Sequence, residues 1–301
     1  MTMRITAQMT ARNTIRDLQG DLQTLSRLQA KMSSGKEITR PSDNPYGASR
    51  ALALRGELEG LQQYQRNVDD GTGWLNASDA ALSKVGDAVH RARELLVRVA
   101  NDSSGEEARE AAALEIDQLI ETIKQEANVQ YAGRYIFAGT ATDRQPYTLL
   151  GADTYAGNGD SIQREIGPQV ELDINVDISS VLGNGQAARD DGLLHTLRDI
   201  ADAMRANDGD RLRGGDLQRL DRSFDALNRM RADVGARTNR LMIADGRLSA
   251  LEENSMRLLS DVEDADSVET LIQYTTQQAA YNMALKAGSN VVQNSLMDFL
   301  R

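Results

Sequence analysis

The sequence predicts a mainly α protein, an elongated, nested helical bundle that carries a small β insert. Long stretches repeat an apolar residue at every seventh position, and aromatic residues make up only 4% of the 301 residues, with four prolines in all. A sustained heptad is typical of rod-like helices that pack along their whole length. One central stretch alternates apolar with acidic residues, which indicates the β insert.

Charge and composition exclude several classes of protein. The net charge of −11 argues against nonspecific nucleic-acid binding, which needs a basic surface. The absence of cysteine excludes disulfides and thiolate metal sites. We find neither the apolar core of a secretory signal nor a run long enough to span a bilayer. No membrane partner is therefore expected, and export would proceed without a cleaved signal peptide of the usual kind.

The two ends of the chain are expected to be long helices. The first should run from about Ile5 to Ser34, capped by Gly35. An ordered connector follows, in which Asn44 and Pro45 are typical of a helix start. Both terminal helices carry a narrow coiled-coil stripe, which runs through Ile15, Leu18, Leu22, Leu25 and Met32 in the first and through Leu271, Tyr274, Tyr281, Leu285, Val292, Leu296 and Phe299 in the last.

Two longer rods are expected between the terminal helices, from about residue 45 to 100 and from about 215 to 260. Every seventh residue of the first rod from Leu54 to Leu96 is apolar, and we expect a weak point at Gly71 and Gly73. The simplest packing places the rods side by side. The second apolar position of each heptad in the first rod has exceptions, which are Glu57, Gly71 and Ser78. In the second rod, Arg237 and Ser255 interrupt the heptad.

The segment between the rods should contain a third helix, the β insert and a short amphipathic helix. Ser104–Glu107 resembles a capping box, and the helix that it opens should end near Gly133. In the insert, Val170–Ile178 is the strand with an acidic face, and its expected partner strands are Tyr135–Phe137 and Ser161–Ile166. The turns are expected at the two Gly-Asn-Gly sequences, 157–159 and 183–185.

This organisation predicts three domains. Residues 1–41 and 262–301 form a terminal coiled-coil assembly domain, residues 42–134 and 186–261 a helical rod domain, and residues 135–185 a small β insert domain. The apolar stripes of the terminal helices are expected to remain partly exposed, because two helices about 45 Å long have only each other to pack against. Neighbouring subunits would then complete the stripes.

No residue set in the sequence is typical of catalysis. His90 and His195, the only histidines, are expected on helix surfaces or boundaries, without carboxylates at metal-ligand spacing. Asp208-Gly209-Asp210 resembles the start of a calcium loop, but Leu212 and Arg213 stand where an oxygen ligand and a glycine are needed. We therefore expect no enzyme, cofactor or metal site. An enzyme or ligand-binding module on a helical stalk is the alternative from another functional class.

Several segments resemble flagellins and their relatives. At the ends of the chain, the similar segments are Met32–Ile38 with Pro41–Pro45, Gln65–Gly71, and Gln277 through Arg301. The middle resembles the insert of the hook–filament junction subfamily, at Tyr135–Thr140 with Pro146-Tyr147 and at Tyr155–Gly159 leading into Arg164–Ile166. Glu37 and the ending Phe299-Leu300-Arg301 depart from the subfamily pattern, and a terminal arginine is similar to flagellins.

The resemblance implies a structural component of the bacterial flagellum. It would be a junction adaptor that joins the hook-side junction protein to the flagellin filament through terminal helices that order on assembly. The implied partners are other copies in a ring, the hook-side junction protein, flagellin and an export chaperone on the C-terminal helix. The implied location is extracellular, after type III export. Flagellin itself, the repeating filament subunit, is the alternative.

Overall fold

The computed structural model describes residues 7–100, 105–184 and 191–299, while the side chains at 7–8, 10–11 and 290–299 lie outside the description. The chain forms two compact units, one from residues 1–60 with 251–301 and one from residues 61–250. The first unit thus takes in the early turns of one rod and the last turns of the other. The division into three domains stays a prediction.

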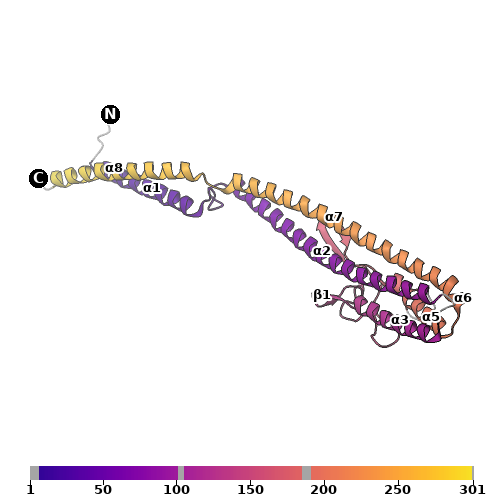
Figure 1. The fold of residues 1–301 in the computed structure, drawn as a ribbon. Coiled ribbons are helices and arrows are strands. Elements are labelled where there is room, and N and C mark those ends of the chain that lie inside the picture. Colours follow the sequence, from indigo (N-terminus) through magenta and orange to yellow (C-terminus); the bar gives the residue numbers. More distant parts are fainter. Residues whose placement is uncertain (1–6, 101–104, 185–190, 300–301) are drawn as a thin grey trace. The chain divides into compact units, whose positions relative to one another are not determined.

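Helices dominate the described chain, and its two sheets are antiparallel pairs of short strands (Figure 1). The prediction of a mainly α fold with a small β insert is confirmed. In order, the elements are α1 (Ala7–Ser34), α2 (Pro45–Val99), α3 (Glu106–Ala127), β1 (Gln130–Tyr131), β2 (Arg134–Tyr135), β3 (Gln163–Gly167), β4 (Val170–Asp173), α4 (Ser179–Leu182), α5 (Leu193–Arg205), α6 (Gly209–Arg211), the π-helical turn η2 (Leu212–Asp216), α7 (Leu217–Glu263) and α8 (Ser267–Phe299).

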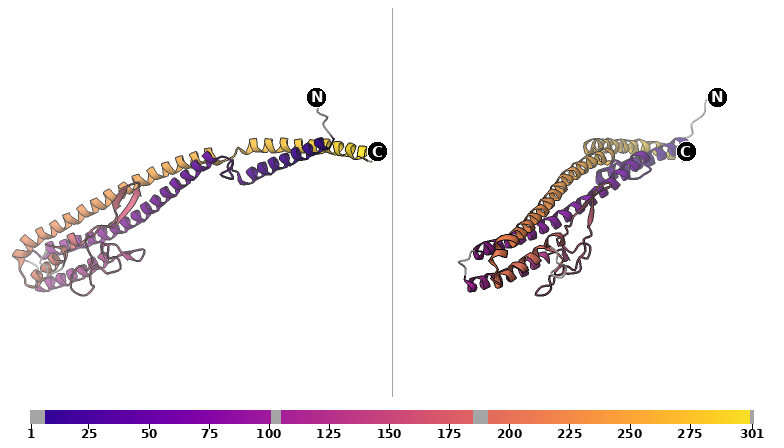
Figure 2. Two further views of the ribbon diagram at one scale, coloured as in Figure 1. Left: turned by 180° about the vertical axis from the view of Figure 1, so that it is seen from behind. Right: turned by 90° about the vertical axis from the view of Figure 1, so that its right-hand side faces the viewer.

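The second unit is built around two antiparallel rods, α2 and α7, which run side by side as expected (Figures 1 and 2). Arg93 Nε lies 2.8 Å from Asp221 Oδ1, and Arg231 Nε lies 3.0 Å from Asp79 Oδ1. Helix α3 packs against α5. All seven expected heptad positions of α2 are buried, namely Leu54, Leu61, Val68, Leu75, Leu82, Val89 and Leu96.

Gly71 and Gly73 do not interrupt α2, which is helical throughout. A Cβ at Gly71 would lie 3.0 Å from Ile174 and 3.2 Å from Leu241, and a Cβ at Gly73 would collide with the hydroxyl of Tyr131. The expected weak point is therefore a place of close approach, where the insert and α7 contact the backbone of α2.

The other polar exceptions in the heptads have partners. Ser255 is buried and its hydroxyl donates to Glu57 Oε1 at 3.4 Å, so that two exceptions on different rods face each other within the first unit. Ser78 is fully buried and donates to the carbonyl of Trp74 one turn earlier, at 2.9 Å. Each exception therefore has a hydrogen-bonding partner, as a buried polar group requires.

Two details of the middle segment differ from the prediction. Helix α3 ends at Ala127, because the Asn128 side chain bonds both the N–H and the carbonyl of Tyr147, at 2.9 and 2.7 Å. The chain then turns back through Ala132 and Gly133, which both have positive φ, as a two-residue hairpin requires. Tyr135 consequently pairs with Gln130 and not with the acidic strand. Gly105 caps α3, while Ser104 and Gly185 lie outside the described residues.

The acidic strand is shorter than expected but has the expected partner. Strand β4 pairs antiparallel with β3, with Arg164 opposite Leu172. Leu172, Ile174, Val176 and Ile178 are buried, whereas Val170 is exposed. After Asp173 the chain leaves the ladder and leads into α4.

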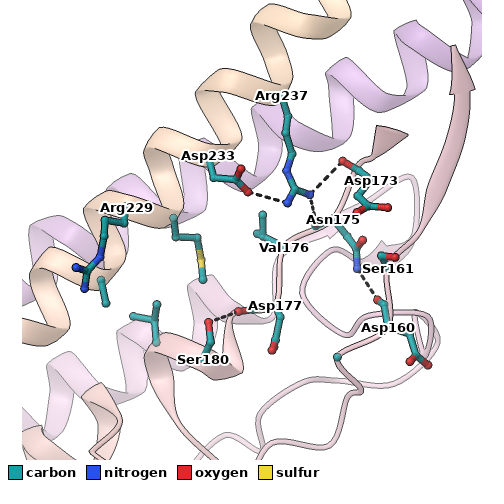
Figure 3. Close-up of a pocket in the computed structure, with 14 residues that line it drawn as sticks. Asp160, Ser161, Asp173, Asn175, Val176, Asp177, Ser180, Arg229, Asp233 and Arg237 are labelled. Carbon is teal, nitrogen blue, oxygen red and sulfur yellow. Dashed lines mark hydrogen bonds and ion pairs between the residues drawn. The ribbon is translucent and has the colours of Figure 1, made fainter. Parts of the chain in front are cut away.

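Arg237, the charged exception in the α7 heptad, holds this segment against the rod. Its guanidinium donates to the backbone carbonyls of Asp173 and Asn175 at 3.2 and 2.9 Å and pairs with Asp233 at 2.7 Å (Figure 3). The four residues that make these bonds help to line an open pocket of about 420 Å³ between the insert and α7. The arginine therefore satisfies one carbonyl at the last residue of β4 and one just beyond the strand.

Arg237→Ala is expected to lower the free energy of unfolding by about 3 kcal/mol, since two hydrogen bonds from a charged group are lost and each contributes about 1.5–3 kcal/mol. Amide exchange at residues 170–178 should accelerate more than exchange elsewhere in the unit. Arg240→Ala is the matched control, because Arg240 is exposed and has no ion pair among the described residues. Equal exchange in both variants would contradict the anchoring role of Arg237.

Candidate assembly interface

The predicted stripe of α1 lies largely in solvent. Ile15, Leu22 and Met32 have exposed fractions of 53%, 54% and 42%, and Leu18 and Leu25 are half-buried. Leu28 is the one buried apolar residue among the described side chains of α1. The sequence therefore located the apolar face, and the structure shows that most of it is not covered within the chain.

Helix α8 lies along α1 and shows the same exposure (Figures 1 and 2). Leu271 and Leu285 have exposed fractions of 49% and 43%, while Tyr274 and Tyr281 are half-buried. The helix continues to Phe299, but the side chains of the remaining predicted positions, Val292, Leu296 and Phe299, lie outside the described residues.

The contact between α1 and α8 is close in places but narrow. Gln277 Nε2 donates to Asp21 Oδ1 at 2.9 Å. A Cβ at Gly288 would lie 2.9 Å from Thr14 Cγ2, so the glycine lets the helices approach. By contrast, α2 buries an apolar residue at every heptad position from Leu54 to Leu96. A pair of helices has no third surface to cover the rest of its stripes, so exposed apolar area concentrates there.

A short backbone pairing, which we name the terminal clip (residues 35–37 and 263–265), joins the connection between α1 and α2 to the connection between α7 and α8. Gly35 caps α1 with a φ of 67°. Glu37 N–H donates to the Glu263 carbonyl at 2.7 Å, and Ala265 N–H donates to the Gly35 carbonyl at 2.9 Å. The Lys36 ammonium, 2.7 Å from Asp264, and the hydroxyl of Ser260 lower the pKa of the Asp264 carboxyl.

The connector after the clip is ordered, as predicted. Asn44 Oδ1 accepts the Gly47 N–H at 2.9 Å and Pro45 opens α2, which confirms the predicted N-cap. The Thr39 side chain and the Arg40 N–H bond the Asp43 carboxylate and lower its pKa. Connector and clip therefore fix the entry of both terminal helices, which a flexible linker would not do.

The motifs of the insert interlock. Gly139 has a φ of 64°, and a Cβ there would collide with Asn158. Asn158 Oδ1 accepts the Thr140 N–H at 2.8 Å, and the Tyr155 hydroxyl donates to the Phe137 carbonyl at 2.8 Å. Burial, and then the Asp177 carboxylate, raise the pKa of Tyr155 to about 12, so its hydroxyl stays protonated. The two segments singled out in the sequence thus form one structural unit.

Sequence reasoning missed a buried charge network beneath this insert. Lys124 of α3 is completely buried, and its ammonium lies 2.7 Å from Asp153 and 3.0 Å from Glu121. It also donates to the carbonyls of Thr148 and Gly151, at 3.2 and 3.0 Å. The Arg198 guanidinium of α5 approaches Asp153 to 3.0 Å. The network ties the loop at residues 148–153 to helices α3 and α5. A lysine adjoining the apolar face of a helix is a weak signal for such a role, because it usually faces water.

The histidines and the short acidic motif have ordinary structural surroundings. His90 is exposed and its ring packs 4.4 Å from that of Phe224, while His195 lies 3.7 Å from Asp199. Asp208 caps α6 by accepting the Arg211 N–H at 3.1 Å. Within the described ranges, no group of three histidines or carboxylates could hold a metal ion, and no helix is long and apolar enough to cross a membrane.

Comparison with known proteins agrees with this arrangement. Residues 5–142 match the bacterial flagellin N-terminal helical region. The chain is 26% identical to the flagellar filament 31.3 kDa core protein of Treponema maltophilum, over 90% of each chain. It is 25% identical to flagellar hook-associated protein 3 of Escherichia coli, over 95% of this chain and 96% of that protein.

The fold also matches solved structures. A flagellar hook-associated protein from Vibrio parahaemolyticus superposes with a TM-score of 0.67 at 22% identity, covering 74% of this chain and 100% of that one. The sequence relatives include filament and hook-associated proteins at nearly equal identity, so identity alone does not separate these two roles. The chain thus has a segment that matches the flagellin N-terminal helical region, on a fold similar to that of a hook-associated protein, and it is flagellin-like in both sequence and fold.

Proposed function

We propose that this chain is a junction adaptor between the hook-side junction protein and the flagellin filament. The observation that carries the proposal is the uncovered stripe on α1 and α8, with Ile15, Leu22 and Leu271 about half exposed. Apolar surface of this kind contributes about 25 cal/mol for each Å² removed from water, so neighbouring subunits would gain by covering it. The fold likeness to hook-associated proteins favours the junction over the filament.

In this function the twelve predicted stripe residues form the interface between subunits. The free chain would keep its terminal helices loosely paired, and assembly would order and cover them. The proposed partners are other copies in a ring, the hook-side junction protein, flagellin, and an export chaperone that holds α8 before assembly. The chain would reach the outside of the cell by type III export. Its role would be structural and not enzymatic.

The location of labelled chain on intact flagella tests the junction role. A single band at the distal end of the hook is expected. Label along the whole filament would overturn the junction role and establish the alternative, a repeating filament subunit. Elongation of a seed by purified chain would likewise favour the filament role, whereas capping of the seed without elongation would favour the junction.

Amide exchange of the free chain tests the conditional order of the ends. We expect weak protection at residues 7–34 and 267–289 and strong protection in the buried parts of α2 and α3, since buried contacts set local stability. Exchange in the terminal helices should slow markedly in assembled material. Strong protection across both terminal helices in the free chain would contradict this part of the proposal.

A further inference from the structure

Helix α7 carries four exposed arginines in one line, which we name the arginine stripe (Arg222, Arg229, Arg240 and Arg247). Their spacing is 7, 11 and 7 residues. Residues 18 apart complete five helical turns and residues 7 apart differ by about 20°, so all four lie on one face. None of them has an ion pair among the described residues, whereas Arg219, Arg231 and Arg237 on the same helix are paired.

Helix α2 carries a line of opposite charge with the same spacing, which we name the acidic stripe (Asp69, Asn76, Asp87 and Glu94). All four side chains are exposed and point away from the buried face of α2. Asp69 and Asp87 have no ion pair within the described ranges, and Glu94 pairs only with Arg91, one turn earlier, at 3.1 Å. Three of its four positions therefore offer a carboxylate.

The two stripes lie at nearly the same height along the rods. Within one copy, Arg93 pairs with Asp221 near one end and Gly71 faces Leu241 near the other. Glu94 is therefore nearly level with Arg222, and Asp69 lies within a few residues of the level of Arg247. Since a residue adds 1.5 Å to a helix, the offset is about one turn or less, within reach of an arginine side chain.

We propose that the arginine stripe of one copy docks on the acidic stripe of a second copy standing beside it. The rods of one copy are antiparallel, so a copy placed in the same orientation presents its α2 antiparallel to the neighbour's α7. Arg222 then faces Glu94, Arg229 faces Asp87, Arg240 faces Asn76 and Arg247 faces Asp69. The inference rests on the proposed function in one respect, that copies stand side by side around a common axis.

Charge complementarity selects a second copy as the occupant. A chain with a net charge of −11 repels its own copies unless opposite charges are aligned. The matched lines of charge would steer two copies together and fix their register. Each arginine also offers a planar fork suited to a carboxylate. The contact should weaken as salt rises, because exposed charges are screened over about 10 Å at 0.1 M salt.

Cysteine cross-linking tests the contact directly, because the chain has no cysteine of its own. The full-length Arg229→Cys/Asp87→Cys variant, oxidised with copper-phenanthroline during assembly, should give a ladder of covalent oligomers. Arg144→Cys/Asp87→Cys is the matched control, since Arg144 is an exposed arginine of the insert. A ladder from the control as strong as that from the stripe pair would overturn the proposal.

Charge reversal gives a second, independent measurement. Arg229→Glu/Arg247→Glu should reduce association of full-length chain at low salt at least tenfold, and Asp69→Lys/Asp87→Lys, which alters the residues opposite them, should do the same. A variant with all four changes restores opposite charges across the contact and should regain most of the loss. Arg134→Glu/Arg144→Glu, also exposed, controls for net charge and should have little effect.

Every altered side chain is exposed, so the thermal unfolding of the free variants should be unchanged. Failure of the four-fold variant to regain association would overturn the docking proposal. The test of the docking contact can be distinguished from the test of the junction role. A label along the whole filament combined with a specific ladder would overturn the junction and keep the contact, whereas a label at the hook without a ladder would do the reverse.

Discussion

Leu22→Asp and Leu285→Asp are each expected to abolish assembly while the thermal unfolding of the free chain stays nearly unchanged. Leu22 and Leu285 have exposed fractions of 54% and 43%, so a carboxylate at either position remains hydrated in the free chain. In an assembly that covers the stripes, the same carboxylate would be buried without a partner, which costs several kcal/mol for each subunit. Incorporation on a seed and calorimetry of the free variants measure the two effects.

Leu114→Asp is the matched control for this experiment. Leu114 has the same exposed fraction as Leu22, 54%, but lies on α3 in the second unit. The control variant should assemble normally. A large fall in the melting temperature of Leu22→Asp would show instead that the stripe belongs to the core of the free chain, and normal assembly of both stripe variants would remove the proposed interface.

The second large effect is expected at the buried charge network. Asp153→Ala leaves the Lys124 ammonium, which is completely buried, with Glu121 as its remaining carboxylate within 4.0 Å. Breaking a buried ion pair by removing one partner costs about 3–5 kcal/mol. Melting of the second unit should fall by about 10 °C, since 1 kcal/mol shifts a domain of this size by about 2–4 °C. Asp143→Ala, an exposed aspartate of the same insert, should change stability by less than about 0.5 kcal/mol.

The same network predicts how stability depends on pH. Burial alone would raise the pKa of the Asp153 carboxyl, but hydrogen bonds from Arg198 and Lys124 outweigh burial and lower it. A lowered pKa in the folded state means that the stabilisation is complete above the unfolded value, about 3.9, and is lost as the pH falls through the folded value. Urea unfolding between pH 5 and pH 2 should therefore show a smaller acid-induced loss in Asp153→Ala than in the parent chain.

Much of the helical fold was predictable because the heptads extend over many turns. The bounds of α1 and α2 agree with the prediction at every described end, and the N-cap at Asn44 is where residue chemistry placed it. The errors arose where local pattern competes with distant contacts. Asn128 ends α3 early because its side chain bonds Tyr147, nineteen positions later, and nothing near Asn128 in the sequence reveals that partner.

The exposed apolar stripe of the terminal helices was predictable for a related reason, and the buried charges were not. A stripe on a terminal helix is visible in the periodicity alone, and the structure then shows that Ile15 and Leu271 remain half exposed. A polar residue in a heptad is destabilising if it has no partner and stabilising if it forms a contact. Ser255 and Glu57 are 198 positions apart, and Arg237 and Asp173 are 64 apart, so only the folded chain reveals that each pair meets.

The terminal clip also sets the order in which the chain can fold. Lys36 and Asp264 are 228 positions apart, so the clip closes the loop that contains the whole second unit. Closing a longer loop costs more entropy, and distant contacts form late when nearer ones can form first. The ends therefore meet only after almost the whole chain has been made and the second unit has folded and shortened the loop. A chain interrupted before residue 263 lacks half of the clip and cannot present paired terminal helices, so under the proposed function it could not join a neighbour.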